Sequence, residues 1–162
     1  MLSVVCPTEL FMHVNCPLPS DTEHCARQLA LQCPKGVVVY LYGDLGAGKS
    51  TFARAFLQQL GVQGPIKSPT YTLLEVYPLP DGSDAVHMDM YRIADPEEVD
   101  YLALGDYERS ASVTFIEWPE KGLGHIPVAG LSITFTHSSL GRQLTFKPEN
   151  SLTENWLKHA FA

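Results

Sequence analysis

An octapeptide at residues 43–50, Gly-Asp-Leu-Gly-Ala-Gly-Lys-Ser, limits this chain to few folds. Its spacing, G-x-x-x-x-G-K-[S/T], is that of a phosphate-binding P-loop. Glycines let the backbone bend until its N–H groups approach phosphate oxygens. Lys49 adds a cation for the β- and γ-phosphates, and the hydroxyl of Ser50 suits Mg2+ as a ligand. We therefore predict a nucleotide-binding loop with these members: Asp44, Leu45, Gly46, Ala47, Gly48, Lys49, Ser50 and Thr51.

The residues on either side of the octapeptide fit the strand and the helix that a P-loop requires. The apolar run at residues 37–42 predicts a buried parallel strand. One face of the following helix carries Phe52, Ala53, Phe56, Leu57 and Leu60. Gly61 is a typical helix end. The octapeptide thus has the strand–loop–helix context of an α/β fold.

Composition and charge narrow the classes of function. The 162 residues suit one domain, residues 1–162, and 45% hydrophobic with 18% charged residues is typical of a globular chain. The net charge of −7 excludes a broad cationic surface for nucleic acid. It fits a protein partner with a basic surface, or a role in solubility. Without a basic leader or an apolar run near ~20 residues, we expect no membrane contact and a cytoplasmic chain.

The four cysteines, Cys6, Cys16, Cys25 and Cys33, contain no C-x-x-C pair. Neither a zinc site nor a disulfide framework is therefore indicated. Cys25 and Cys33 share a helical face with Leu29, which favours burial of both thiols. Residues 1–19 carry three prolines and form a poorly defined N-terminal segment, with an edge strand around residues 10–14.

The rest of the chain alternates helix and strand signals. A capping box of Ser20 and Glu23 starts a helix over about 21–33. Residues 71–77 and 85–90 predict a hairpin across a Pro-Asp-Gly turn. A helix starts at Asp95 and ends at Gly105. Later segments are a buried strand at 113–116, an antiparallel pair at 131–135 and 143–146, and a closing helix at 152–161. The predicted fold is an α/β P-loop NTPase, with a mainly parallel central sheet flanked by helices and an antiparallel C-terminal extension.

A Mg2+ ion beside a P-loop also needs a carboxylate from a neighbouring strand. Glu117 follows the apolar run 113–116, and Asp89 lies at the end of the run 85–90. Both occupy strand ends, where the ligands of parallel sheets collect. The residue pattern alone leaves open which acid binds the metal, or whether either is a solvated strand end. His87 shares a strand face with Asp89, and we favour a buttressing role for it over that of a general base.

Two further elements have alternative interpretations. The segment Ser68-Pro69-Thr70 is either a nucleotide-sensing switch, whose hydroxyls bind the γ-phosphate or the Mg2+ shell, or an ordinary turn. Trp118 either packs on a nucleotide or fills the core.

Four segments together resemble a known family. Residues 43–50, 68–73, 87–92 and 115–119 occur in the order and spacing of the TsaE family, also called YjeE. The likeness covers roughly residues 20–146. It implies a small bacterial ATPase for N6-threonylcarbamoyladenosine at position 37 of tRNAs that read codons beginning with adenine. It also implies a TsaB–TsaD pair as partners, with tRNA contacted only indirectly through that complex.

The resemblance also implies roles for single residues. Ser50 and Glu117 hold Mg2+, and Asp89 acts in the hydrolysis of ATP to ADP, which with Lys49 gives a catalytic set of Lys49, Asp89 and Glu117. Ser68, Pro69 and Thr70 correspond to the switch loop, and Arg142 to a late arginine of the nucleotide site. Two features depart from the family pattern: Ser50 stands where threonine is commoner, and the N-terminal segment is longer.

Two rival functions belong to other classes. One is a free-standing small-molecule kinase, which usually brings lid arginines to the transferred phosphoryl group. Residues 119–130 offer only Lys121 and His125 for that purpose. The other rival is a nucleotide-sensing module without catalysis, which release of ADP would exclude.

Overall fold

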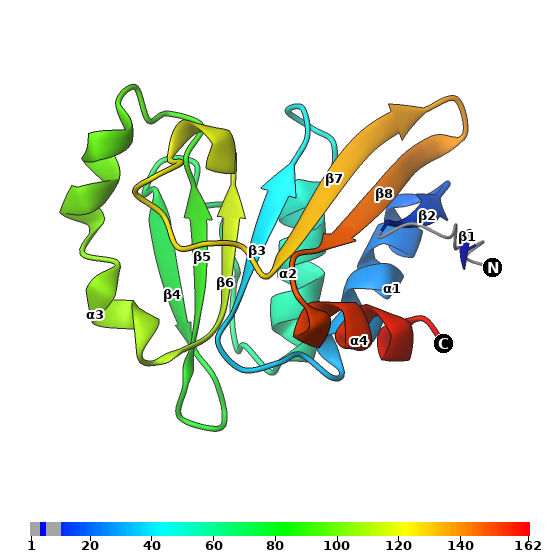
Figure 1. Ribbon diagram of the computed structural model, residues 1–162, viewed down its shortest axis with the longest axis horizontal. Helices are drawn as coiled ribbons and strands as arrows, with labels where there is room; N and C mark the ends of the chain where they lie inside the picture. The colour runs from blue at the N-terminus through cyan, green and yellow to red at the C-terminus, as the bar shows by residue number, and fades with distance from the viewer. Residues whose placement is uncertain (1–3, 6–10) are drawn as a thin grey trace.

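A computed structural model describes residues 4–5 and 11–162 (Figure 1). Its described strands are β1 (Val4–Val5), β2 (Met12–Cys16), β3 (Val37–Tyr42), β4 (Leu74–Pro78), β5 (Asp84–Asp89), β6 (Ala111–Glu117), β7 (Leu131–Ser138) and β8 (Gly141–Pro148). Its α-helices are α1 (Pro19–Ala30), α2 (Lys49–Gln59), α3 (Gly105–Glu108) and α4 (Ser151–Ala160). Two 3-10 helices are η1 (Pro96–Leu102) and η2 (Pro119–Lys121).

The described strands form one sheet of eight, in the order β1-β2-β8-β7-β3-β6-β5-β4. The four central strands β7, β3, β6 and β5 run parallel to one another. The hairpin β7–β8 adds antiparallel strands on one side, with β2 and β1 beyond it, and β4 adds one on the other side. The predicted parallel centre with an antiparallel extension is therefore confirmed.

Register places the two candidate acids at one edge of the sheet. Asp89 on β5 lies opposite Glu117 on β6, and Glu117 lies opposite Leu41 on β3. The P-loop leaves the end of β3 at the same edge. Because the carboxyl ends of parallel strands meet there, the topology alone gathers the three site segments.

Helices α1, α2 and α4 pack on one face of the sheet around aromatic side chains. The ring of Phe56 meets Phe115 edge-on with centroids 4.9 Å apart, and it also contacts Trp156. The indole N–H of Trp156 donates to the carbonyl of Leu29 at 2.9 Å, which links α4 to α1. Figure 1 shows α1 and α2 side by side behind the strands. This core fixes the start of α2, and with it the P-loop.

A second apolar cluster covers the opposite face of the sheet. Strand residues such as Met88 and Ile116 pack there against Val99 of η1. The Asp95 carboxylate caps η1 by accepting from the N–H of Glu97 at 2.9 Å, which confirms the predicted helix start. Gly105, however, does not end that helix. Ala103 ends it with φ 52°, and Gly105 begins α3.

The N-terminal predictions need further correction. Helix α1 starts at Pro19 after Leu18, and the Asp21 carboxylate, not Glu23, accepts the N–H of Leu18 at 2.8 Å. Proline suits that first position because the N–H it lacks has no helical partner there. The helix ends at Ala30, so Cys25 is buried within it while Cys33 lies beyond it and is half-buried. Burial raises the pKa of Cys33 to about 12.

Two smaller differences complete the comparison. The predicted edge strand is β2, which lies between β1 and β8 and is not an edge. Residues 71–73 form a turn, and the hairpin strand starts only at Leu74. The prediction for Cys6, like most of residues 1–10, lies outside the described residues. Within the described ranges no helix is long and apolar enough to cross a bilayer.

Candidate functional site

The P-loop bends sharply between β3 and α2, and two of its glycines are required for that course. Gly43 has φ 146°, and a Cβ atom on it would lie 2.8 Å from the carbonyl oxygen of Phe135. Gly48 has φ 107°, and a Cβ there would collide with the guanidinium of Arg142. Both values are unfavourable for residues with side chains. The loop thus brings the N-terminus of α2, the positive end of the helix dipole, to the sheet edge.

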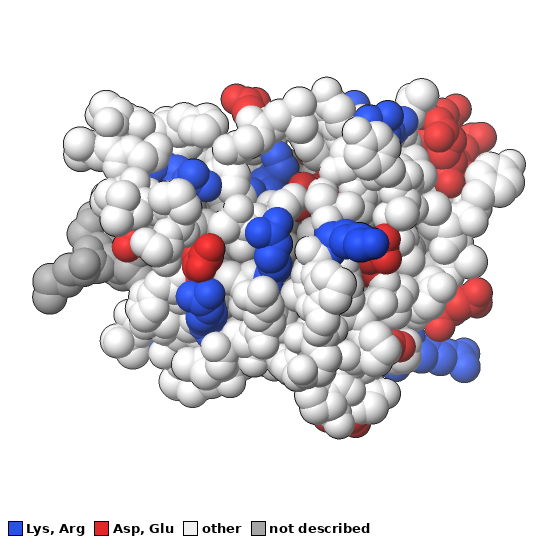
Figure 2. All heavy atoms as spheres, turned by 180° about the vertical axis from the view of Figure 1, so that it is seen from behind, with Lys and Arg blue, Asp and Glu red and all other residues white. Residues whose placement is uncertain are grey.

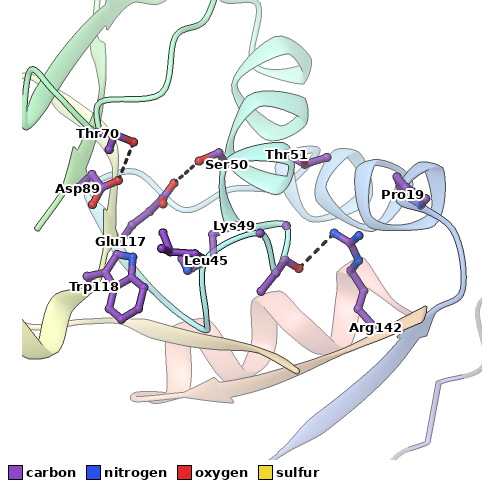
Figure 3. Close-up of a pocket in the computed structure, with 13 residues that line it drawn as sticks. Pro19, Leu45, Lys49, Ser50, Thr51, Thr70, Asp89, Glu117, Trp118 and Arg142 are labelled. Atoms are coloured by element: carbon purple, nitrogen blue, oxygen red, sulfur yellow. Dashed lines mark hydrogen bonds between the residues drawn. The ribbon is translucent and has the colours of Figure 1, made fainter. Parts of the chain in front are cut away.

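A cavity of about 280 Å3 opens where α2 begins (Figure 3). Its walls are Pro19, Leu45, Gly46, Ala47, Gly48, Lys49, Ser50, Thr51, Thr70, Asp89, Glu117, Trp118 and Arg142. Most of the predicted nucleotide, metal and catalytic residues therefore meet in one place. Asp44, Ser68 and Pro69 do not line this cavity. Pro19 was missed, because nothing in its local pattern indicates that the start of α1 packs beside the P-loop.

Lys49 lines this cavity and is buried, with 4% of its surface exposed. Its Nζ donates to the carbonyl oxygens of Gly43 and, at 2.9 Å, Asp44. It also lies 4.6 Å from the centroid of the Trp118 ring. Burial lowers the pKa of Lys49, while the charge of Glu117 opposes that shift. The amine is thus held inside the loop, where a bound anion would meet it.

Glu117 ends β6 and accepts two hydrogen bonds on one carboxylate oxygen. The Oγ of Ser50 donates to its Oε1 at 2.9 Å, and Nε2 of His87 lies 2.9 Å from the same atom. Only 3% of Glu117 is exposed. Burial raises its pKa, but the hydrogen bonds from His87 and Ser50 outweigh burial and hold the pKa below its ordinary value. The group is therefore a carboxylate at neutral pH.

Asp89 joins the cavity to the predicted switch segment. Thr70 Oγ1 donates to its Oδ2 at 3.2 Å, and the N–H of Tyr91 donates to its Oδ1 at 2.8 Å. Ser68 reaches the site only through Thr70, with the two hydroxyl oxygens 2.7 Å apart. Burial raises the pKa of Asp89, and the nearby charge of Glu117 adds to the rise. A carboxylate destabilised in this way is a better proton acceptor than an exposed one.

Trp118 and Arg142 flank the loop on two sides. Trp118 is half-buried with φ 55° and packs on the second apolar cluster, in line with the core interpretation. It also lines the cavity, and its packing on a nucleotide stays a prediction. Arg142 on β8 donates from Nη1 to the carbonyl of Ala47 at 3.1 Å. The antiparallel extension thereby contacts the P-loop backbone directly.

Comparison with known proteins assigns the chain to a family. A family model for the "Threonylcarbamoyl adenosine biosynthesis protein TsaE" matches residues 16–144. The chain belongs to the TsaE family. The family proteins function in tRNA threonylcarbamoyladenosine biosynthesis, as the names of the relatives state.

Individual TsaE relatives cover most of the chain. The "tRNA threonylcarbamoyladenosine biosynthesis protein TsaE" of Haemophilus influenzae is 42% identical over 127 residues, which is 78% of this chain and 80% of the relative. The Bacillus subtilis protein of the same name is 34% identical over 133 residues, with 79% and 80% covered. The crystal structure of YdiB from Bacillus subtilis superimposes with a TM-score of 0.74 at 26% identity, covering 99% of this chain and 95% of that one.

Proposed function

We propose that this chain is the ATP-binding and ATP-hydrolysing component needed to form the threonylcarbamoyl group on N6 of adenosine 37, in tRNAs that read codons beginning with adenine. The observation that supports this most is the meeting of four groups in one cavity: Lys49, Ser50, Asp89 and Glu117. A cation, a hydroxyl and two carboxylates at a helix N-terminus are the parts that phosphoryl chemistry on a nucleotide uses.

The donor set also suits Mg2+. Ser50 Oγ and the Glu117 carboxylate are hard oxygen ligands held 2.9 Å apart. The described residues contain no group of three or more His, Cys, Asp and Glu side chains able to hold a metal, so the other ligands would be phosphate oxygens and water. Bound there, Mg2+ would neutralise charge on the β- and γ-phosphates.

The chain's own residues supply the remaining functions. The backbone N–H groups of residues 44–50 and Lys49 bind the phosphates, and Trp118 and Arg142 border the nucleotide. Asp89 orients the attacking water and accepts its proton, in line with the raised pKa of its buried carboxyl. Thr70 connects the state of Asp89 to the 68–70 segment, which would change its hydrogen bonds when the γ-phosphate leaves.

The partners we propose are TsaB-like and TsaD-like proteins, with tRNA contacted only through their complex in the cytoplasm. The surface charge supports protein partners over direct tRNA binding. Exposed acids follow one another through η1 and α3: Asp95, Glu97, Glu98, Asp100, Asp106 and Glu108. Figure 2 shows acidic side chains gathered at the end of the molecule where these elements lie. Such a surface repels phosphates and suits a basic protein surface.

The small-molecule kinase has less support. Its two candidate lid groups are bound elsewhere: Lys121 donates to the carbonyl of Tyr91, and His125 pairs with Asp100 at 3.0 Å. Neither side chain lines the cavity. A kinase lid would bring such groups to the phosphates.

The decisive experiment is ATPase activity of the chain alone and with TsaB- and TsaD-like proteins from the same source. We expect partner-dependent release of ADP, and formation of threonylcarbamoyladenosine on tRNA that stops without this chain. A screen of phosphate acceptors with labelled ATP runs in parallel. Transfer of label to a small molecule would establish the kinase, and an absence of ADP over hours would leave only a nucleotide-sensing role.

A further inference from the structure

His87 is a buried polar side chain for which the proposed hydrolysis has no direct task. It lies on β5 with 1% of its surface exposed. On one side its ring meets the ring of Phe115 edge-on, with centroids 6.4 Å apart and planes at 74°. On the other side its Nε2 lies 2.9 Å from Oε1 of Glu117. The imidazole therefore sits between the apolar core and the end of β6.

The hydrogen-bond partners determine which ring nitrogen of His87 carries the proton. In the part of the chain that the structure describes, Nδ1 of His87 is buried and has no hydrogen-bond partner. A proton on Nδ1 would be a buried donor without an acceptor, which costs free energy. In the neutral ring, a proton on Nδ1 would also leave Nε2 unprotonated, with its lone pair facing a carboxylate oxygen of Glu117. The proton must instead be on Nε2, which donates to Glu117.

Packing alone does not account for a histidine at this position. A phenylalanine would fill the space beside Phe115 without leaving a buried nitrogen unpaired. The hydrogen bond of His87 goes to one atom, Oε1 of Glu117, and the hydroxyl of Ser50 donates to that same atom. The two donors converge from β5 and α2, so together they fix the rotation of the carboxylate and leave its other oxygen, Oε2, for a further ligand.

We infer that His87 is a positioning residue that sets the orientation in which Glu117 meets Mg2+. This inference rests on the proposed nucleotide function, because His87 contacts a proposed metal ligand and not the metal itself. Residues that hydrogen-bond to metal-ligating side chains hold those ligands in place, and their loss typically weakens metal affinity about 10- to 100-fold. His87 acts through Glu117 and touches neither the nucleotide nor the water.

Three substitutions separate positioning from packing. H87F keeps a ring in the core and removes the donor. H87Q keeps a donor, because the glutamine nitrogen is as many bonds from Cβ as Nε2 is. H87N is the matched control, because its nitrogen corresponds to Nδ1 and is too short to reach Glu117.

The readout is binding of a fluorescent ADP analogue, which needs no turnover, measured with Mg2+ and with a chelator. We expect H87F and H87N to lose about 10- to 100-fold of the affinity gain that Mg2+ gives the parent chain. Affinity in chelator should stay at the parent value in all variants, and H87Q should recover most of the Mg2+ gain. Each variant serves as its own reference, which cancels any general loss of active protein.

Other outcomes would overturn the inference. An H87F protein with the parent's Mg2+ gain would make His87 a core residue only. Equal losses with Mg2+ and with chelator would indicate a general distortion of the site. If H87F does not fold, the comparison of H87Q with H87N decides, and equal behaviour of those two contradicts positioning. A parent chain that binds no nucleotide would overturn the proposed function as well, whereas the preceding outcomes leave that function intact.

Discussion

Ser50 Oγ donates a hydrogen bond to Glu117 Oε1 across 2.9 Å, which joins the first turn of α2 to the end of β6. The two residues are far apart in the sequence but neighbours in the site, because β3 and β6 pair in parallel. The bond holds both proposed Mg2+ ligands together within the protein itself. Such preorganisation lowers the cost of assembling the site on binding.

Replacing Glu117 by alanine should keep measurable nucleotide binding but remove Mg2+-dependent turnover. The loop N–H groups and Lys49 still hold the phosphates, while the metal loses its carboxylate. The change also leaves the Nε2 donor of His87 buried without an acceptor, which we expect to destabilise the fold by about 1–3 kcal/mol. Mg2+ titrations of ATPase rate and thermal unfolding curves test both effects, with the exposed Glu120→Ala as control. An unchanged Mg2+ dependence would assign the metal to Asp89.

Lys49→Ala should weaken ATP binding and abolish hydrolysis. The amine is held in the loop by the carbonyls of Gly43 and Asp44, ready to meet the phosphates. Because hydrogen bonds to charged groups contribute about 1.5–3 kcal/mol, we expect about 10- to 100-fold weaker binding. Calorimetry with ATP measures this, and Lys35→Ala, which breaks only an exposed ion pair with Asp81, is the matched control. Hydrolysis at the parent rate by the Lys49 variant would contradict the P-loop assignment.

Asp89→Asn should stabilise the fold at neutral pH while it removes hydrolysis. Burial raises the pKa of Asp89 above its ordinary 3.8, so the folded chain binds this proton more tightly than the unfolded chain does. The parent therefore loses stability as the pH rises from about 3.8 through the raised pKa. The asparagine variant has no such loss, and its amide oxygen can still accept from Tyr91.

The pH dependence distinguishes this effect from a change in packing. The advantage of Asp89→Asn should be largest at neutral pH and shrink as the pH falls toward 3.8. The Glu117 carboxyl changes the stability in the opposite direction. Because its pKa lies below the ordinary 4.5, the ionised carboxylate stabilises the fold above about pH 4.5, and this stabilisation is lost as the pH falls through the lowered pKa. Urea unfolding of parent and variant from pH 3 to 8 measures the difference, with the exposed Asp106→Asn as control. An advantage that stays constant over this range would refute the electrostatic cause.

Local chemistry made part of this structure predictable from the sequence. The P-loop depends on residues whose chemical properties few others share: Gly43, Gly48, Lys49 and Ser50. Their spacing therefore predicted the loop, the strand before it and the helix after it. Glu117 could be placed because a parallel sheet gathers strand ends at one edge. Hydrophobic periodicity likewise located the β7–β8 pair and α4 to within a few residues.

The remaining contacts depend on how separate segments pack. Pro19 reaches the cavity only because α1 packs beside α2. Thr70 lines the cavity and Ser68 does not, and this choice depends on the conformation of the turn that carries them. The guanidinium of Arg92 stacks on Tyr71, 4.4 Å from the ring centroid. None of these contacts follows from spacing or periodicity.

That stacking contact should restrain the loop that carries Thr70. Tyr71 has 81% of its surface exposed, so the contact with Arg92 contributes only about 0.5–1 kcal/mol. Tyr71→Ala should leave the melting temperature nearly unchanged and speed hydrogen exchange at the amide of Leu73, which bonds to the Pro69 carbonyl. Arg92→Ala should act alike, and the double variant should add little. Tyr101→Ala, on η1, is the control; equal exchange in all four variants would mean that the stack restrains nothing.

The isolated chain should hydrolyse ATP slowly, well below the typical enzyme median of ~10 per second. Fast phosphoryl-transfer enzymes place an arginine against the charge that develops on the γ-phosphate, a contribution of about 10³ to 10⁵ in rate. Among the described basic residues only Lys49 and Arg142 line the cavity, and Arg142 is bound to the Ala47 carbonyl.

Stimulation should therefore come from a partner, either through a residue inserted in trans or through ordering of residues 68–72 around Thr70 and Asp89. Ordering of the loop would act on the site because Thr70 lines the cavity and donates to Asp89. Steady-state ADP release is measured first for the chain and then for the assembly with TsaB- and TsaD-like proteins. Adding partners to the Thr70→Val variant separates the routes: lost stimulation supports loop ordering through the Thr70 hydroxyl, and retained stimulation supports a residue in trans. Rapid turnover by the chain alone, unaffected by partners, would contradict both and favour a free-standing enzyme.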